Sequence, residues 1–146
     1  MNRYEEMNRR HRYEVKNLPI FFAFSNEQFE EGMKSFGLAP NETDKIFKLD
    51  NTGGYYRRDD AEQIHGLIDR QKKERNDAIQ ADATGDGFIF DMFLWELEQH
   101  EFVVTGFWDS TLRAIGMNPK EVEADARLLH GLKKAARKIY ENAGLR

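Results

Sequence analysis

The sequence predicts an α+β fold, in which about six helices pack around a small, mainly antiparallel sheet. Apolar residues recur at helical spacing along most of the chain, whereas the segments with strand-like composition are short and scattered. The 146 residues include eleven Phe and two Trp, enough large apolar side chains to oppose the entropy cost of ordering. We expect a single domain over residues 1–146, because no repeat, linker or low-complexity tract interrupts the chain.

A helix, a strand and a second helix are predicted at the start of the chain. Residues 2–16 are polar with a thin apolar stripe, which is typical of a surface helix. The apolar run 18–24 predicts a buried strand. Ser25 and Gln28 have the spacing of a capping box, so we expect a helix that begins after Ser25 and ends at Gly37.

A hairpin and a long helix are predicted next. Residues 45–49 and 55–58 are β-like and flank a loop at 50–54, whose glycines can adopt the positive φ that a hairpin needs. Asp59 predicts the start of a helix, and apolar residues continue at a 3.6-residue period to Ala81.

The second half of the chain is predicted to be mostly helical. Residues 88–100 are apolar nearly all round and indicate a helix, whereas residues 102–105, with two Val, predict a strand. A short helix is expected over residues 109–116. One last helix begins at Asn118 and Pro119, because Asn is a favoured N-cap and Pro is favoured at the first helical position.

Composition excludes several classes of protein. Without cysteine, the chain has no disulfide, no thiolate zinc site and no cysteine nucleophile. The first residues lack the apolar core of a signal peptide, and the longest strongly apolar stretch, 88–97, is shorter than the roughly 18–20 residues of a membrane span. We therefore expect a soluble, cytoplasmic protein with no membrane partner.

The common catalytic motifs are absent from the sequence. It contains no phosphate-binding loop, no dinucleotide glycine fingerprint and no His-Glu-x-x-His motif. None of its three serines stands in a nucleophile elbow. We expect no catalytic residue and no cofactor, and hence a non-enzymatic protein.

Two residue pairs are candidate metal ligands. Asp82 and Asp86 lie in a loop that resembles the front of an EF-hand, but Phe93 stands where the bidentate Glu is needed. Glu96 and His100 are four residues apart on one helix face. Capping of the next helix by Asp86 explains the loop, and the helix dipole favours a histidine near a C-terminus. Metal binding is the alternative interpretation of both pairs.

Basic residues gather near both ends of the chain. Residues 1–16 hold five Arg or Lys against three Glu, and residues 120–146 hold seven against four Asp or Glu. Four of the cations recur along one predicted helix and could contact phosphate: Lys133, Lys134, Arg137 and Lys138. The net charge is −4, however, and no nucleic-acid-binding motif is present, so we expect a solvated helix face and only weak, salt-sensitive binding to nucleic acid alone.

The segment 76–112 is the most unusual part of the sequence. It holds eight Asp or Glu, no Lys or Arg, and seven Phe or Trp. A helix that is apolar nearly all round either lies in a core or meets a partner. In the second case aromatic side chains would anchor a basic protein partner and carboxylates would steer it. The residues of this predicted docking surface are Asp86, Phe88, Asp91, Met92, Trp95, Glu96 and Glu98.

Three sequence strings carry a resemblance. They are FFAFSNEQFEEG at 21–32, GDGFIFDMF at 85–93 and LLHGLKKA at 128–135. The chain resembles an uncharacterised family of small proteins encoded by phages and mobile elements of Gram-positive bacteria. The loop 50–54 departs from the glycine-rich tip of that family. Proteins of this size and genomic setting include inhibitors of host defence such as anti-CRISPR proteins, which the resemblance implies as a function.

These observations lead to three hypotheses. The first is a non-enzymatic binding protein of a mobile element, an anti-CRISPR-like inhibitor of a defence nuclease that uses the acidic, aromatic-rich surface. The second is a small metal-binding protein or metal-dependent enzyme with His and carboxylate ligands. The third is a nucleic-acid accessory protein that uses the basic helices at the two ends of the chain.

Overall fold

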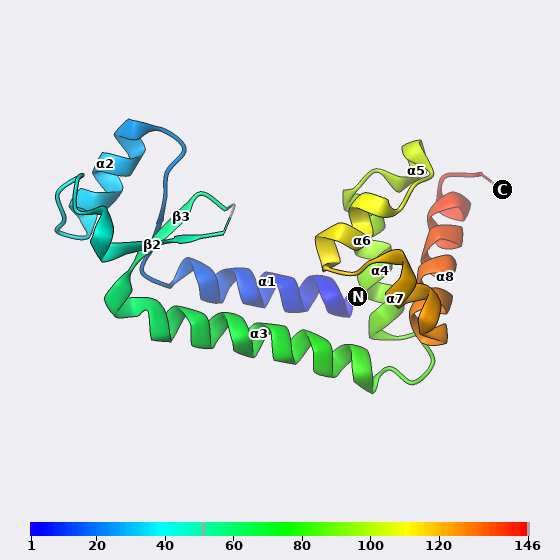
Figure 1. The fold of residues 1–146 in the computed structure, drawn as a ribbon. Helices are drawn as coiled ribbons and strands as arrows, with labels where there is room; N and C mark the ends of the chain where they lie inside the picture. The colour runs from blue at the N-terminus through cyan, green and yellow to red at the C-terminus, as the bar shows by residue number, and fades with distance from the viewer. Residues whose placement is uncertain (51, 146) are drawn as a thin grey trace. The chain divides into compact units, whose positions relative to one another are not determined.

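The computed structural model describes residues 1–50 and 52–145 (Figure 1). It confirms the α+β class, because the described residues form eight α-helices and a three-stranded antiparallel sheet. They group into two compact units, of which unit 1 consists of residues 1–10 and 73–146 and unit 2 of residues 11–72. The expectation of a single domain over residues 1–146 stays a prediction.

Unit 2 contains the sheet. Strands β1 (Ile20–Phe22), β2 (Ile46–Leu49) and β3 (Gly54–Arg57) lie in the order β1-β3-β2, and β3 pairs antiparallel with both neighbours. The predicted hairpin of β2 and β3 is confirmed, and Gly53 in its loop has a φ of +78°, a conformation that favours glycine. Asn51 of the same loop lies outside the described residues.

Helix α2 (Asn26–Ser35) begins and ends as its sequence predicts. The Ser25 hydroxyl accepts a hydrogen bond from the Gln28 backbone N–H at 3.2 Å, and the Gln28 side chain accepts one from the Phe24 N–H at 2.7 Å. Beyond the helix, Gly37 adopts a φ of +73° and the Leu38 N–H donates to the Met33 carbonyl at 2.9 Å. These bonds satisfy backbone groups that the helix itself leaves unpaired.

Strand β1 corrects the prediction of a buried strand over residues 18–24. Only three residues pair with β3, and none of them is buried. Phe21 packs beside α2, with its ring centroid 5.0 Å from that of Phe36. Successive side chains of a strand point to opposite faces, and Phe22 is 49% exposed. An apolar run in a short edge strand therefore does not require that both faces be covered.

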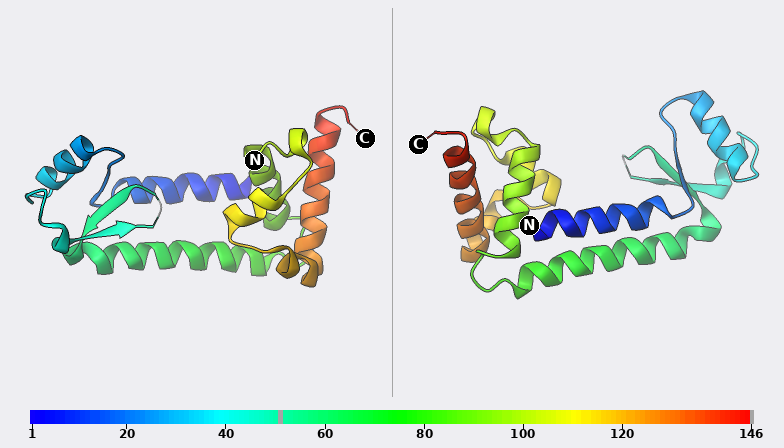
Figure 2. Two further views of the ribbon diagram at one scale, coloured as in Figure 1. Left: turned by 45° about the horizontal axis from the view of Figure 1, so that its top comes forward. Right: turned by 180° about the vertical axis from the view of Figure 1, so that it is seen from behind.

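Helix α4 (Phe88–Gln99) is the centre of unit 1 and packs along α8 (Ala126–Asn142), as both figures show (Figure 1, Figure 2). Ile89, Phe93 and Leu97 face the core, and each has 0% exposure. At the crossing, Gly131 lets the two helices approach closely, because a Cβ added there would lie 2.6 Å from Ile89 Cγ2. The apolar character of α4 is therefore that of a core helix.

Residues Phe102–Thr105 form a helical turn, α5, so the prediction of a strand was wrong. The backbone N–H groups of Thr105 and Gly106 donate to the carbonyls of Glu101 and Phe102, at 3.2 and 2.8 Å. Strand propensity depends on packing against neighbouring strands, and here the backbone makes local bonds instead. Gly106 then ends the turn with a φ of +72°.

The last helix is divided in two, which corrects the prediction of one continuous helix. Helix α7 (Pro119–Ala124) starts at the predicted Asn118 cap, but Asp125 is extended, with φ −115° and ψ 109°. Its carboxylate accepts from the Arg127 backbone N–H at 3.0 Å and so caps α8. The interruption is therefore stabilised by a second N-cap.

The remaining helices agree with the sequence to within one or two residues. They are α1 (Arg3–Lys16), α3 (Ala61–Ala81) and α6 (Asp109–Ile115), and short 3₁₀ turns at Thr43–Lys45 and Arg58–Asp60 precede β2 and α3. Within the described residues, no helix combines the length and apolar character needed to cross a membrane.

Candidate functional site

Asp82 caps helix α4 from the loop before it. Its Oδ1 accepts from the backbone N–H groups of Thr84 and Gly85, at 3.3 and 2.9 Å. Its Oδ2 accepts from those of Gly87 and Ile89, both at 3.0 Å. Burial raises the pKa of this carboxyl, but the four amide donors outweigh burial, so the pKa of Asp82 is lowered. Both oxygens of this EF-hand-like residue are therefore engaged by the protein's own backbone.

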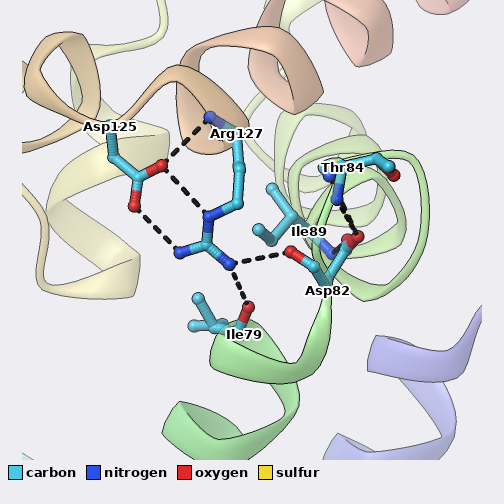
Figure 3. Close-up of polar contacts among 7 residues, drawn as sticks. Ile79, Asp82, Thr84, Ile89, Asp125 and Arg127 are labelled. Carbon is cyan, nitrogen blue, oxygen red and sulfur yellow. Dashed lines mark hydrogen bonds and ion pairs between the residues drawn. The ribbon is translucent and has the colours of Figure 1, made fainter.

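Arg127 connects that loop to the start of α8 (Figure 3). Its Nη1 donates to the carbonyls of Ile79 and Asp82, at 3.0 and 2.7 Å, while its Nη2 donates to Asp125 Oδ2 at 2.9 Å. Gly85 lies against the Arg127 backbone, because a Cβ added to Gly85 would be 2.2 Å from the Arg127 carbonyl oxygen. These contacts hold the loop in place against the start of α8, which indicates a structural role for it.

Asp86 does not cap α4, which corrects the role expected for it. Its Oδ1 lies 2.7 Å from His130 Nε2 and 2.8 Å from Lys134 Nζ. Lys134 and His130 hydrogen-bond to the carboxylate and lower the pKa of Asp86 to about 2. Lys134 also lies over the Phe90 ring, 5.0 Å from its centroid. Lys134, one of the four cations that could contact phosphate, is thus paired within unit 1.

The two acids in the middle of α4 hold the start of α1. Asp91 Oδ2 accepts from the backbone N–H and the Nε of Arg3, at 2.9 and 2.7 Å. Glu96 accepts from the Tyr4 hydroxyl at 3.3 Å. Burial raises the pKa of Glu96, although the positive charge of a protonated His100 and the Tyr4 hydrogen bond both act to lower it.

Most of the predicted acidic docking surface lies inside unit 1. Its buried members, each at most 8% exposed, are Phe88, Asp91, Met92 and Glu96. Trp95 is partly buried against the same core, while Asp86 and Glu98 are exposed. The buried side chains are not accessible to a partner, so the structure favours the core interpretation of this helix.

The candidate metal ligands do not gather into a larger set. Across residues 1–50 and 52–145, no three His, Asp or Glu side chains are grouped so that they could hold a metal ion. Glu96 and His100 remain a pair on α4, and Asp82 and Asp86 have the protein partners described above. This arrangement gives no support to a metal centre in the described part of the chain.

A pocket of about 620 Å³ lies between α5, the segment after it and α8. We call it the aromatic pocket. The Phe102 and Trp108 rings are stacked, with centroids 6.2 Å apart and an interplanar angle of 13°. The Tyr140 ring centroid is 5.2 Å from that of Phe102. The remaining lining residues are Gly106, Lys133, Ala136, Arg137, Glu141 and Leu145.

Exposed apolar side chains lie on the segments that form this pocket. Val104 and Phe107 are 79% and 73% exposed, and Val103 and Leu145 are 39% and 48% exposed. Single exposed apolar residues are ordinary, but several of them beside an apolar pocket indicate an interaction site. We refer to the pocket together with these four residues as the α5 surface.

The sequence contained part of the signal for the α5 surface. Residues 102–108 hold five large apolar side chains in seven positions. Three of these five are among the seven Phe or Trp of residues 76–112. On α8, Lys133, Arg137 and Tyr140 follow a spacing of four and three residues, which places them on one helix face. The meeting of these two segments depends on tertiary packing, and sequence reasoning missed it.

A second, more polar pocket of about 400 Å³ lies in unit 2. The Tyr56 hydroxyl is 2.7 Å from His65 Nε2 at this pocket. Two Lys and two Asp also line it, so neither sign of charge prevails. Its lining therefore does not select a class of ligand.

The fold and the α5 surface define a small α+β protein with an apolar pocket and a well-packed helical core. The chain belongs to a family of unknown function, DUF7659, whose sequence profile matches residues 3–138. No curated protein and no solved structure matched the chain.

Proposed function

We propose that this protein is a non-enzymatic binding protein that captures a protein partner on the α5 surface. The observation that carries the proposal is the exposure of Val104 and Phe107, at 79% and 73%, beside an aromatic pocket of about 620 Å³. Aromatic and aliphatic side chains that enter a pocket supply most of the affinity of a typical interface. Covering exposed apolar groups of this kind removes them from water and so stabilises the complex.

The resemblance to small proteins of phages and mobile elements gives this proposal a more specific form. The partner would then be a bacterial defence nuclease, such as a CRISPR effector, and binding would inhibit it. Most of the carboxylates expected to contact a basic groove are buried or paired within unit 1. The proposal therefore places the contact on the α5 surface.

A matched pair of serine substitutions tests the proposal. Phe107→Ser removes an exposed ring from the α5 surface, whereas Phe24→Ser removes one of similar exposure, 78%, from unit 2. Each variant would be compared with wild type in quantitative affinity capture from cells that carry the gene, after circular dichroism has shown that it is folded. We expect Phe107→Ser to lose the specific partner and Phe24→Ser to retain it. Equal capture by all three proteins would contradict the proposal.

A further inference from the structure

The rim of the aromatic pocket is positively charged. Lys133 and Arg137 line it, and Lys138 follows them on the exposed part of α8. Within residues 1–50 and 52–145, none of these three cations makes an ion pair, whereas Lys134 is bound to Asp86. Glu141 is the single acid among the lining residues. The pocket therefore presents an excess of positive charge at its edge.

The acids of the neighbouring segment do not cancel this charge at the pocket. Asp91 is bound to Arg3, and Glu96 is 7% exposed beneath Tyr4. Glu101 and Asp109 flank the pocket-forming segment in sequence, but neither lines the pocket. A partner in the pocket would thus contact two cations, Lys133 and Arg137, and one acid, Glu141.

The floor of the pocket fits an apolar side chain better than a nucleobase. Proteins that hold single-stranded nucleic acid stack bases on exposed aromatic faces along a basic groove. Here Phe102 is only 3% exposed, Trp108 and Tyr140 are partly exposed, and the aliphatic side chains of Ala136 and Leu145 complete the apolar lining. A pocket of about 620 Å³ with such walls has the size and character of a site for a large apolar group.

We propose that the aromatic pocket takes a large apolar side chain from an acidic segment of the partner protein, whose carboxylates pair with Lys133 and Arg137. This inference rests on the proposed function and adds the chemistry of the partner. The partner's charge is thus the opposite of the basic partner expected from the sequence, because the exposed cations at this pocket are unpaired. Charge complementarity at a rim mainly sets the rate of association and the choice of partner, while the apolar anchor supplies the affinity.

Selection from a library of short random peptides tests the inference. The full chain would serve as bait, and the enriched sequences would show which charge the pocket selects. Binding of the enriched peptides would be followed by Trp108 fluorescence in a Trp95→Phe background, where Trp108 is the one remaining tryptophan. We expect peptides with Phe, Trp or Leu flanked by Asp or Glu, and affinity that falls as salt rises, because exposed charges are screened.

A pair of double charge reversals provides the matched control. Lys133→Glu with Arg137→Glu should weaken the acidic peptides by roughly tenfold or more. Arg113→Glu with Lys120→Glu makes the same change of net charge at exposed positions that do not line the pocket, and should change affinity by about twofold or less.

The other outcomes separate this inference from the proposed function. Enrichment of basic peptides whose binding still needs Phe107 would overturn the acidic partner and leave the binding function intact. Tighter binding of single-stranded DNA or RNA than of any peptide at physiological salt would overturn the inference as well. If no peptide perturbs Trp108 and Phe107→Ser captures its partner normally, both the inference and the proposed function are wrong.

Discussion

Substitution of Asp82 distinguishes a helix cap from a metal-binding loop. Asp82→Ala removes the acceptor for four backbone N–H groups, of which those of Gly85, Gly87 and Ile89 are at 2.9, 3.0 and 3.0 Å in partly buried surroundings. Each lost bond of this kind costs about 1 kcal/mol, and water can replace part of it. We therefore expect the free energy of unfolding to fall by about 2–4 kcal/mol.

Asp82→Asn gives a graded version of the same test. The amide keeps one acceptor oxygen and places an NH₂ group toward two of the donors, so about half of the loss, 1–2 kcal/mol, is expected. Asp77→Asn is the control, because Asp77 forms an exposed i,i+4 pair with Lys73 that is worth about 0.5 kcal/mol or less. Urea unfolding followed by circular dichroism measures all three variants. A loss below about 1 kcal/mol for Asp82→Ala would refute the capping argument.

The dependence of stability on pH and on calcium provides a second test of whether Asp82 caps the helix or binds a metal ion. The lowered pKa of Asp82 means that its carboxylate stabilises the fold above the ordinary value of 3.8, and this contribution is lost as the pH falls through the folded-state pKa. Wild type should therefore lose more stability than Asp82→Asn as the pH falls below 3.8. Added calcium should leave the melting temperature unchanged, and an increase abolished by Asp82→Asn would show that the loop binds the ion.

Three further predictions concern the core and its packing. Thr111 has 0% exposure, and its hydroxyl has no hydrogen-bond partner in the described part of the chain. Thr111→Val should therefore stabilise the fold by about 1 kcal/mol, as measured by urea unfolding. A loss of stability would show that the hydroxyl has a partner after all. Burial raises the pKa of Glu96, so the folded state holds this proton more tightly, and wild-type stability should fall as pH rises through the window from the ordinary value of 4.5 to that raised pKa. Glu96→Gln should reduce that slope in a pH series of melting temperatures, with the remainder due to Glu98, whose pKa burial also raises. The same slope in both proteins would contradict the assignment. Gly131→Ala should destabilise the fold by about 1–2 kcal/mol because the added Cβ would contact Ile89. Gly66→Ala, where nothing lies within 4 Å of the added Cβ, should stabilise it by about 0.5–1 kcal/mol. A change in the free energy of unfolding with the same sign for both variants would contradict the packing argument.

Features that depend on neighbouring residues in the chain were predictable from the sequence. The Ser25 cap, the stop at Gly37 and the hairpin around Gly53 formed as expected, while the Gln28 side chain bonds the N–H of Phe24 and not that of Ser25. The Asn118 cap also formed, with its side chain accepting from the Glu121 backbone N–H at 2.9 Å. In each case a short side chain or a glycine satisfies backbone groups within a few residues.

Features decided by tertiary packing were not predictable. Asp125 interrupts the last helix because its carboxylate binds Arg127, whose guanidinium is held by the carbonyls of Ile79 and Asp82. The aromatic pocket likewise needs Phe102 and Tyr140 to meet across two separate segments. Hydrophobic periodicity identifies which residues of a helix are apolar, but it does not identify the element that covers them.

The acidic segment shows how this ambiguity affected the functional hypothesis. A count of charges treats every carboxylate of α4 as a surface group, whereas Asp91 and Glu96 are 8% and 7% exposed and hydrogen-bond to Arg3 and Tyr4. Buried carboxylates exert little steering on a distant partner when they are paired within the protein, and exposed unpaired charges control the local field. The exposed charges that line the aromatic pocket and make no ion pair within the described residues are two cations of α8, Lys133 and Arg137, and one acid, Glu141, so the balance at the pocket is positive. Steering by exposed charge therefore favours an acidic partner at the aromatic pocket, in contrast to the basic partner expected from the sequence.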